Sequence, residues 1–240
     1  MVPMIWLYGK HACYAALQNK NRQIHKVVVT QKNERDAVSK LVQTNTRIDM
    51  MGKKDLDNLV GRDAVHQGIA VQVTPLGYED ISYLKNLTEE NQIVVVLDQV
   101  TDPHNVGAIL RSCAAFGVKA LIEQERHSPK ETAALAKTAS GALEIIPRIH
   151  VGNLSQNMKD LQSMGFWTVG FSEEAKEYLH KADLKGKIAI VMGSEGDGLR
   201  RLTEEKCDFH LKLPTANFST LNVSTATSVA LYQTFIIQNT

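Results

Sequence analysis

Residues 97–112 read LDQVTDPHNVGAILRS, and Leu97 is also the last residue of the unbroken apolar run 93–97, IVVVL. Such a run is typical of a strand that is buried on both faces of a sheet. After Asp98 come turn-forming residues, and the second apolar run 106–110 predicts a helix. A buried strand that leads through a polar loop into a helix is the building unit of α/β proteins. Free backbone N–H groups at such a helix start attract anions, so we expect a ligand near this stretch.

The same pattern continues on both sides of this stretch. The expected strands of residues 92–240 are 93–97, 120–122, 145–149, 167–171, 188–192 and 210–213, and the expected helices are 106–117, 129–139, 153–164, 174–182, 198–206 and 221–237. This alternation predicts an α/β fold with a mostly parallel sheet and helices on both of its faces.

The first 75 residues form a smaller α/β pattern of their own. Helices are expected at 12–17, 34–42 and 55–60, and strands at 27–29 and 68–73. Turn residues at 74–77 and a polar segment with one amphipathic helix follow, so we take 76–91 as a linker between domains 1–75 and 92–240.

Composition and charge narrow the class of protein. The 240 residues are 43% hydrophobic and 22% charged, as in ordinary globular proteins, and no apolar run reaches the roughly 18–20 residues of a membrane helix. The first residues lack a signal-peptide layout, and the three cysteines are too widely spaced for a metal site. We therefore expect a cytosolic, reduced protein without a metal, or one from an organelle of bacterial type.

The net charge of +1 conceals an uneven distribution. Residues 1–75 carry 11 Lys and Arg against 6 Asp and Glu, a net charge of +5, whereas residues 76–240 carry 16 against 20, a net charge of −4. A basic first domain indicates a polyanionic partner, and a basic surface without a partner is the alternative.

Two further polar segments follow expected strands. Residues 193–198 read GSEGDG, and residues 213–224 read LPTANFSTLNVS. In a parallel sheet both segments lie at the same edge as the stretch after residue 97, where α/β proteins bind ligands. Neither a G-x-G-x-x-G nor a phosphate-binding G-x-x-x-x-G-K-[ST] pattern is present. The alternatives are a plain surface turn for the first segment and a helix cap for the second, with Ser219 or Thr220 as the cap and Asn222 and Ser224 in the first turn.

Residues 102–112, 192–198 and 213–224 resemble, in order, the three motifs of the SpoU (TrmH) class of RNA ribose 2′-O-methyltransferases in the SPOUT superfamily. The stretches Tyr8-Gly9 and 68–70 resemble the small L30e-like RNA-binding domain of that class. The amino-acid sequences of the motifs are most similar to those of the branch that methylates a guanosine of large-subunit (23S) rRNA.

The resemblance implies several features beyond the reach of sequence patterns. It implies a carboxyl-terminal chain threaded into a deep trefoil knot, the α/β-knot fold, and S-adenosylmethionine (S-adenosyl-L-methionine) bound in that knot. It also implies a homodimer, and the apolar helix near the carboxyl end would suit a subunit interface or a core. Its apolar residues are Val223, Ala226, Val229, Ala230, Phe235 and Ile236.

The resemblance also assigns the site residues. Arg111 is the leading catalytic residue, and Asn105, Glu195 and Ser224 support it; Gly193, Leu213, Leu221 and Asn222 would bind the cofactor. A guanidinium keeps its proton at neutral pH, so we interpret Arg111 as a phosphate clamp and not as a general base. His104 is an alternative base. The cofactor would then lie against the loops at 193 and 213–221, with Asn105 and Arg111 facing the RNA.

Three alternatives remain open at the level of the sequence. The substrate could be a tRNA guanosine, since the same motifs serve both kinds of RNA. The protein could be a non-catalytic RNA-binding relative, or an NAD-dependent oxidoreductase on a similar sheet. One departure from the pattern is the loop 215–218, TANF, which is one residue shorter than in the rRNA branch and lacks its methionine and glycines.

Overall fold

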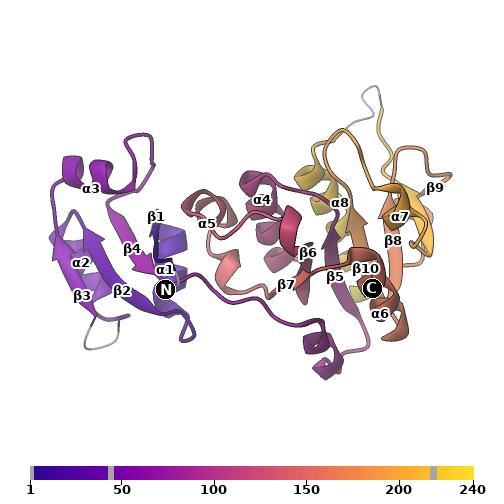
Figure 1. The fold of residues 1–240 in the computed structure, drawn as a ribbon, viewed down its shortest axis with the longest axis horizontal. Coiled ribbons are helices and arrows are strands. Elements are labelled where there is room, and N and C mark those ends of the chain that lie inside the picture. The colour runs from indigo at the N-terminus through magenta and orange to yellow at the C-terminus, as the bar shows by residue number, and fades with distance from the viewer. Residues whose placement is uncertain (1–2, 43–45, 217–220) are drawn as a thin grey trace. The chain divides into compact units, whose positions relative to one another are not determined.

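The computed structural model describes residues 3–42, 46–216 and 221–240, which form two compact units (Figure 1). The first unit comprises Met1–Gly77 together with Lys130–Ile145. The second comprises Tyr78–Pro129 and Ile146–Thr240. The segment 130–145, which the sequence pattern placed in the second domain, therefore folds with the first.

The first unit is built on a four-stranded sheet in the order β1-β4-β2-β3. Strand β4 is antiparallel to both β1 and β2, whereas β2 and β3 are parallel. The elements of this unit are β1 (Ile5–Tyr8), α1 (Lys10–Gln18), β2 (Ile24–Val29), α2 (Lys32–Val38), β3 (Arg47–Met50), α3 (Lys53–Val60), β4 (Ile69–Val73), α5 (Ala133–Ala139) and the 3₁₀ helix η3 (Ala142–Glu144).

Helix α5 is held in the first unit by apolar packing and by a buried ion-pair cluster. It lies against β1 and α1, and Leu135, Ala136 and Ala139 are buried. The guanidinium of Arg22, which is fully buried, contacts Glu131 at 2.7 Å and also pairs with Glu144. Glu131 precedes α5 and Glu144 is the last residue of η3, so Arg22 binds the segment 130–145 near both of its ends.

The second unit contains a seven-stranded sheet in the order β7-β6-β5-β10-β8-β11-β9, and all its pairings are parallel. The elements are η1 (Ile81–Asn86), β5 (Gln92–Leu97), α4 (Pro103–Ala115), β6 (Ala120–Gln124), η2 (Glu125–His127), β7 (Arg148–Val151), α6 (Leu154–Ser163), β8 (Trp167–Phe171), β9 (Glu177–Tyr178), η4 (Leu179–Lys181), β10 (Lys187–Met192), α7 (Arg201–Glu204), β11 (Phe209–Lys212) and α8 (Val223–Asn239). The predicted α/β fold with a mostly parallel sheet is confirmed.

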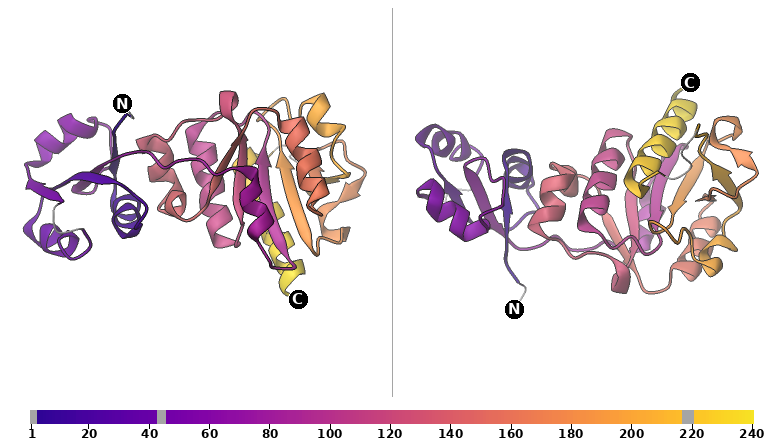
Figure 2. Two further views of the ribbon diagram at one scale, coloured as in Figure 1. Left: turned by 60° about the horizontal axis from the view of Figure 1, so that its bottom comes forward. Right: turned by 90° about the horizontal axis from the view of Figure 1, so that it is seen from above.

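Helices cover both faces of this sheet (Figure 2). Helix α6 and η1 pack on one face, where Met158 and Leu84 join Val94 and Val96 in a continuous apolar core. On the other face α4 and α8 pack against each other, and α8 also contacts β10. The central strand β5 is buried along its whole length, as its apolar run predicted.

Several local predictions were wrong. The expected helix 174–182 is the short strand β9 followed by η4, and the polar segment 78–91 contains only the six-residue η1. Strand β7 begins at Arg148, three residues later than expected, and the pattern gave no signal for β3. Within the part of the chain that the structure describes, no helix has the length and apolar character needed to cross a membrane.

Candidate active site

The carboxyl ends of four parallel strands lie at one edge of the second unit. The register pairs Met192 of β10 with Leu97 of β5, and Val191 of β10 with Gly170 of β8. Leu211 of β11 is paired in turn with Phe171. The loops that leave these strands therefore start side by side, as expected for the ligand edge of a parallel sheet.

The loop after β10 is a tight turn that requires a glycine at its first position. Ser194 and Gly198 exchange two backbone hydrogen bonds, of 3.0 and 3.1 Å. A Cβ atom on Gly193 would lie only 2.0 Å from the backbone carbon of Gly198. Because it has no side chain, Gly193 allows the backbone of residues 198 and 199 to approach closely, and its own backbone is not covered by a side chain.

The same loop is tied to the end of β5 through a buried carboxylate. Asp98 is fully buried, and its two oxygens accept hydrogen bonds from the backbone N–H of Arg200, at 3.1 Å, and from its Nε, at 2.7 Å. The guanidinium of Arg200 also donates to Gln124 at the end of β6. Because a buried charge needs such partners, this contact fixes where the chain continues after the 193–198 turn.

Three predicted site residues meet in one hydrogen-bonded cluster, although they come from the first turn of α4, the turn after β10 and the start of α8. The Nδ2 of Asn105 donates to Glu195 at 3.3 Å, and the Nδ2 of Asn222 donates to both oxygens of Glu195, at 3.2 and 3.3 Å. Asn222 also donates to the Oδ1 of Asn105 at 3.1 Å. The Glu195 carboxylate is thus held by two amides that orient each other.

Ser224 joins this cluster through Asn222. The Oδ1 of Asn222 accepts from the backbone N–H of Ser224 at 2.9 Å and from its hydroxyl at 2.6 Å, so Asn222 is the N-cap of α8. One turn later, Ser228 bonds to Ser112 of α4 at 2.7 Å. Ser219 and Thr220, considered as caps from the sequence, lie outside the described residues.

Arg111 lies on α4 but does not join the cluster. Its side chain is exposed, and among residues 3–42, 46–216 and 221–240 it has no hydrogen-bond or ion-pair partner. The guanidinium is therefore available to an external anion. His104 is also exposed, and its backbone N–H donates to the N-cap residue Asp102 at 2.9 Å.

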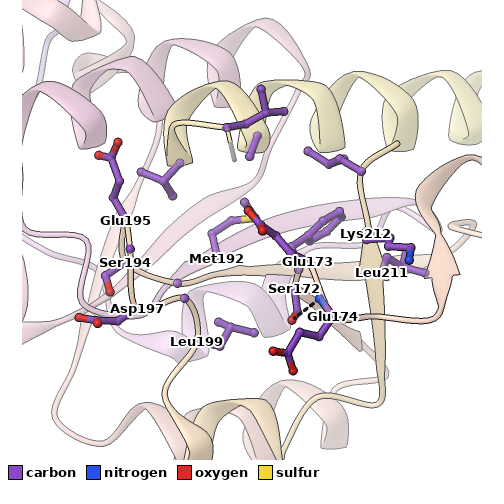
Figure 3. A pocket seen from close by; sticks show the side chains of 18 of the residues that line it. Ser172, Glu173, Glu174, Met192, Ser194, Glu195, Asp197, Leu199, Leu211 and Lys212 are labelled. Atoms are coloured by element: carbon purple, nitrogen blue, oxygen red, sulfur yellow. Dashed lines mark hydrogen bonds between the residues drawn. The ribbon is translucent and has the colours of Figure 1, made fainter. Parts of the chain in front are cut away.

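A cavity of about 960 Å³ opens beside the cluster (Figure 3). Of the predicted cofactor residues, Gly193, Leu213, Leu221 and Asn222 all line it, and so does Glu195. Apolar side chains, Met192, Leu199, Leu211 and Val223 among them, supply further walls. The structure therefore brings the predicted cofactor residues to one concave site, and Asn105 and Arg111 do not line it.

Sequence reasoning missed one side of this cavity. Residues 171–174 and Tyr178, in the segment that follows β8, line it together with residues of the loops already described. This segment carries no recognisable motif, and its residues from 174 onward were expected to form a helix. The rule that ligands bind beyond the carboxyl ends of parallel strands applies to β8 as well, and it was the available signal.

Cys207 packs behind this region, where its thiol approaches the backbone of Gly170. Burial raises the pKa of the Cys207 thiol to about 12, so the thiol is protonated at neutral pH. This cysteine is therefore not a nucleophile for the neighbouring cavity.

Comparison with known proteins identifies relatives over nearly the whole chain. Residues 92–232 match the SpoU rRNA Methylase family, and residues 6–79 match the family described as RNA 2′-O ribose methyltransferase substrate binding. A 23S rRNA (guanosine-2′-O-)-methyltransferase RlmB of Pseudomonas putida is 37% identical over 235 residues, covering 95% of this chain and 94% of its own. The RlmB of Vibrio parahaemolyticus is 39% identical over 236 residues, with 95% of each chain covered.

A solved structure shows the same fold at lower identity. The SpoU methyltransferase AviRb from Streptomyces viridochromogenes, in complex with AdoMet, superimposes with a TM-score of 0.82 at 20% identity, covering 97% of this chain and 89% of that one. Since the family match spans more than half of the chain and the relatives align almost from end to end, this protein belongs to the SpoU rRNA methylase family.

Proposed function

We propose that this protein transfers a methyl group from S-adenosylmethionine to the ribose 2′-hydroxyl of a guanosine in large-subunit (23S) rRNA. The observation that carries the proposal is the combination of 37–39% identity to RlmB enzymes across both units with a formed cavity at the motif loops. A cytoplasmic location would follow from such a substrate.

The cavity suits S-adenosylmethionine in size and in the character of its walls. Leu213 and Leu221 supply apolar surface for an adenine, and the bare backbone at Gly193 lets a ligand approach closely. Asn222 offers a polar group at the same site. When bound, the cofactor supplies an electrophilic methyl group, and the chain positions the ribose beside it.

Arg111 is proposed to bind the RNA. Its permanently charged guanidinium has no partner among the described residues, so it is free to hold a phosphate of the target nucleotide and to stabilise developing negative charge. Asn105, Glu195 and Ser224 support this side of the site, because the cluster fixes the loop ends on which the ribose would lie.

The first unit is proposed to be an L30e-like RNA-binding domain. Its residues 1–75 carry a net charge of +5. Lys53 and Lys54 at the start of α3 are exposed and form no ion pair with the described residues, so they are open to phosphates. The match of residues 6–79 to a substrate-binding family supports the same role.

The knot and the homodimer implied by the motifs are also proposed here. The chain returns to the middle of the sheet after β8, because β10 lies between β5 and β8, and α8 then crosses to pack on α4. On α8, Val229, Tyr232 and Ile236 form an exposed apolar stripe, whereas Val223 and Ala230 are buried in the unit itself. The stripe would be the part of α8 that a second subunit covers.

Replacing Arg111 tests the assigned reaction. Arg111→Ala should retain binding of S-adenosylmethionine, measured by calorimetry, and should lose methyl transfer to large-subunit rRNA by roughly 100-fold or more. Arg126→Ala, an exposed arginine of η2, is the matched control and should keep the wild-type rate. Near-normal transfer by the Arg111 variant would remove the role assigned to this residue.

The choice of RNA needs a separate measurement. Mapping of 2′-O-methylguanosines in cells with and without the gene should show one position lost from 23S rRNA. A position lost from a tRNA instead would keep the reaction and replace the substrate.

A further inference from the structure

The lining of the cavity carries an excess of negative charge. One ammonium group, on Lys212, faces five carboxylates, on Glu173, Glu174, Glu195, Asp197 and Glu204. The Lys212 ammonium lies 4.6 Å from the centre of the Tyr178 ring, at the end of the cavity formed by β9 and β11. Most of the negative charge is therefore not compensated within the lining.

The carboxylates differ in how they are bound. Glu195 is occupied by the amides of Asn105 and Asn222. Glu173, by contrast, forms no hydrogen bond or ion pair with any residue that the structure describes. In Figure 3 its carboxylate extends over the cavity toward Met192, whereas that of the neighbouring Glu174 extends away from it. Glu173 is thus an exposed carboxylate without a partner among the described residues, and its side chain extends into the ligand space.

The proposed reaction changes the charge of the bound molecule. S-adenosylmethionine carries a sulfonium, an ammonium and a carboxylate, with a net charge of +1. Once the methyl group has left, the sulfur is a neutral thioether, and the net charge of S-adenosylhomocysteine is zero. An uncompensated carboxylate in the cavity therefore attracts the cofactor more strongly than the product.

We propose that Glu173 is a specificity-determining residue that makes the cavity favour the positively charged cofactor over the neutral product. This inference rests on the proposed function in that S-adenosylmethionine is the methyl donor. The attraction between the Glu173 carboxylate and the bound molecule weakens when the methyl group is transferred. Product release would then be favoured without a conformational change of the protein.

Binding measurements on the full-length protein test the proposal without any turnover. Titration calorimetry would be done with S-adenosylmethionine, S-adenosylhomocysteine and sinefungin, a cofactor analogue with an ammonium in place of the sulfonium. In Glu173→Gln, the affinity for the two cationic ligands should fall by about 3- to 10-fold. The affinity for S-adenosylhomocysteine should change less than about twofold, because that ligand carries no charge at sulfur. Glu173→Asp, which keeps the charge, should recover part of the preference.

The control separates a local effect from a change in total charge. Glu90→Gln removes the same charge at an exposed position outside the cavity, and it should leave all three affinities unchanged. Added salt should reduce the preference in the wild type more than in Glu173→Gln.

Other outcomes would overturn the proposal. An equal loss for all three ligands would make Glu173 a contact to their common part, and no loss would place it outside the bound ligand. If the wild-type protein bound none of the three ligands, the proposed function itself would be wrong.

Discussion

Asn222 shows how one side chain can serve both the fold and the site. Its Oδ1 accepts the backbone N–H of Ser224 and so caps α8, while its Nδ2 donates to Glu195 and Asn105. The cap determines which end of the amide faces the cluster, because the oxygen is already occupied by Ser224. The helix start thereby sets the direction of a hydrogen-bond donor in the site.

Replacing Asn222 by aspartate separates these two roles. Aspartate is as good an N-cap as asparagine, so the free energy of unfolding should change by less than about 0.5 kcal/mol. The donor, however, is replaced by a second carboxylate beside Glu195, and methyl transfer should fall by roughly 10- to 100-fold. Urea unfolding and a methylation assay measure the two effects.

Asn222→Ala is the comparison variant. It loses the cap as well as the donor, and it should cost about 1 kcal/mol of stability in addition to the activity. Full activity in Asn222→Asp would show that the donor to Glu195 is not needed.

The residues of the cluster could be chosen from the sequence, but their contacts could not. The resemblance to the family's motifs selects Asn105, Glu195 and Asn222, and the parallel fold brings the segments that carry them to one edge of the sheet. That Asn222 also caps α8 depends on where the helix begins, and the sequence pattern indicated Ser219 or Thr220 as the cap, with Asn222 in the first turn. Glu173 was not selected because it directly precedes the helix expected at 174–182 and belongs to none of the three motifs.

At the scale of elements, the segment that enters the second unit is bound to the edge strand β7. The backbone N–H of Glu79 donates to the carbonyl of Arg148 at 2.8 Å, and the Tyr78 ring stacks on His150 with ring centres 3.3 Å apart. On the neighbouring strand β6, the buried Glu123 is the register partner of His150 and pairs with Arg148 at 2.7 Å. The spacing of Ile81, Leu84 and Leu87 predicted one amphipathic helix in the segment that follows, and it gave no indication that Glu79 pairs with the edge strand.

This arrangement predicts an effect of pH on stability. Burial, together with the positive charge of Arg148, lowers the pKa of His150 from 6.5 to about 4. Between these values the unfolded chain binds a proton that the folded protein excludes, so the free energy of unfolding falls as the pH is lowered from about 6.5 to about 4. His150→Phe keeps a ring against Tyr78 and removes the titration.

The variant should lose less stability across this pH range than the wild type, by about 2 kcal/mol, in urea unfolding at a series of pH values. The comparison is needed because burial raises the pKa of Glu123, which stabilises the fold as the pH falls and so opposes the effect of His150. Parallel curves for the two proteins would contradict the prediction.

At the scale of the whole molecule, the first unit is discontinuous in sequence. The chain leaves it after residue 77, returns for 130–145, and leaves it again. The predicted domains 1–75 and 92–240 did not anticipate this return, because a short helix with an apolar face has the same sequence pattern on whichever sheet it packs. The partners of the buried Arg22, Glu131 and Glu144, are more than 100 residues away in sequence.

Arg22→Met tests how much this cluster contributes. The substitution leaves Glu131 and Glu144 buried without their cation, so the free energy of unfolding should fall by roughly 3–5 kcal/mol. Hydrogen exchange should increase in α5 and in α1, which pack together.

Arg47→Met, at an exposed arginine that pairs with Asp49, is the control and should cost less than about 0.5 kcal/mol. A loss of less than about 1 kcal/mol in Arg22→Met would mean that apolar packing alone holds the segment 130–145 in place.

The return of the chain at 130–145 also has a consequence for synthesis on the ribosome. The first 77 residues emerge without α5, so Leu135, Ala136 and Ala139 are missing from their core and Arg22 has no carboxylate partner. Residues 78–145 take roughly 3–14 s to be added at ordinary elongation rates. The first unit therefore cannot finish folding until residue 145 has been added, when most of the second unit has yet to be synthesised, and a chain truncated before residue 145 leaves both units incomplete.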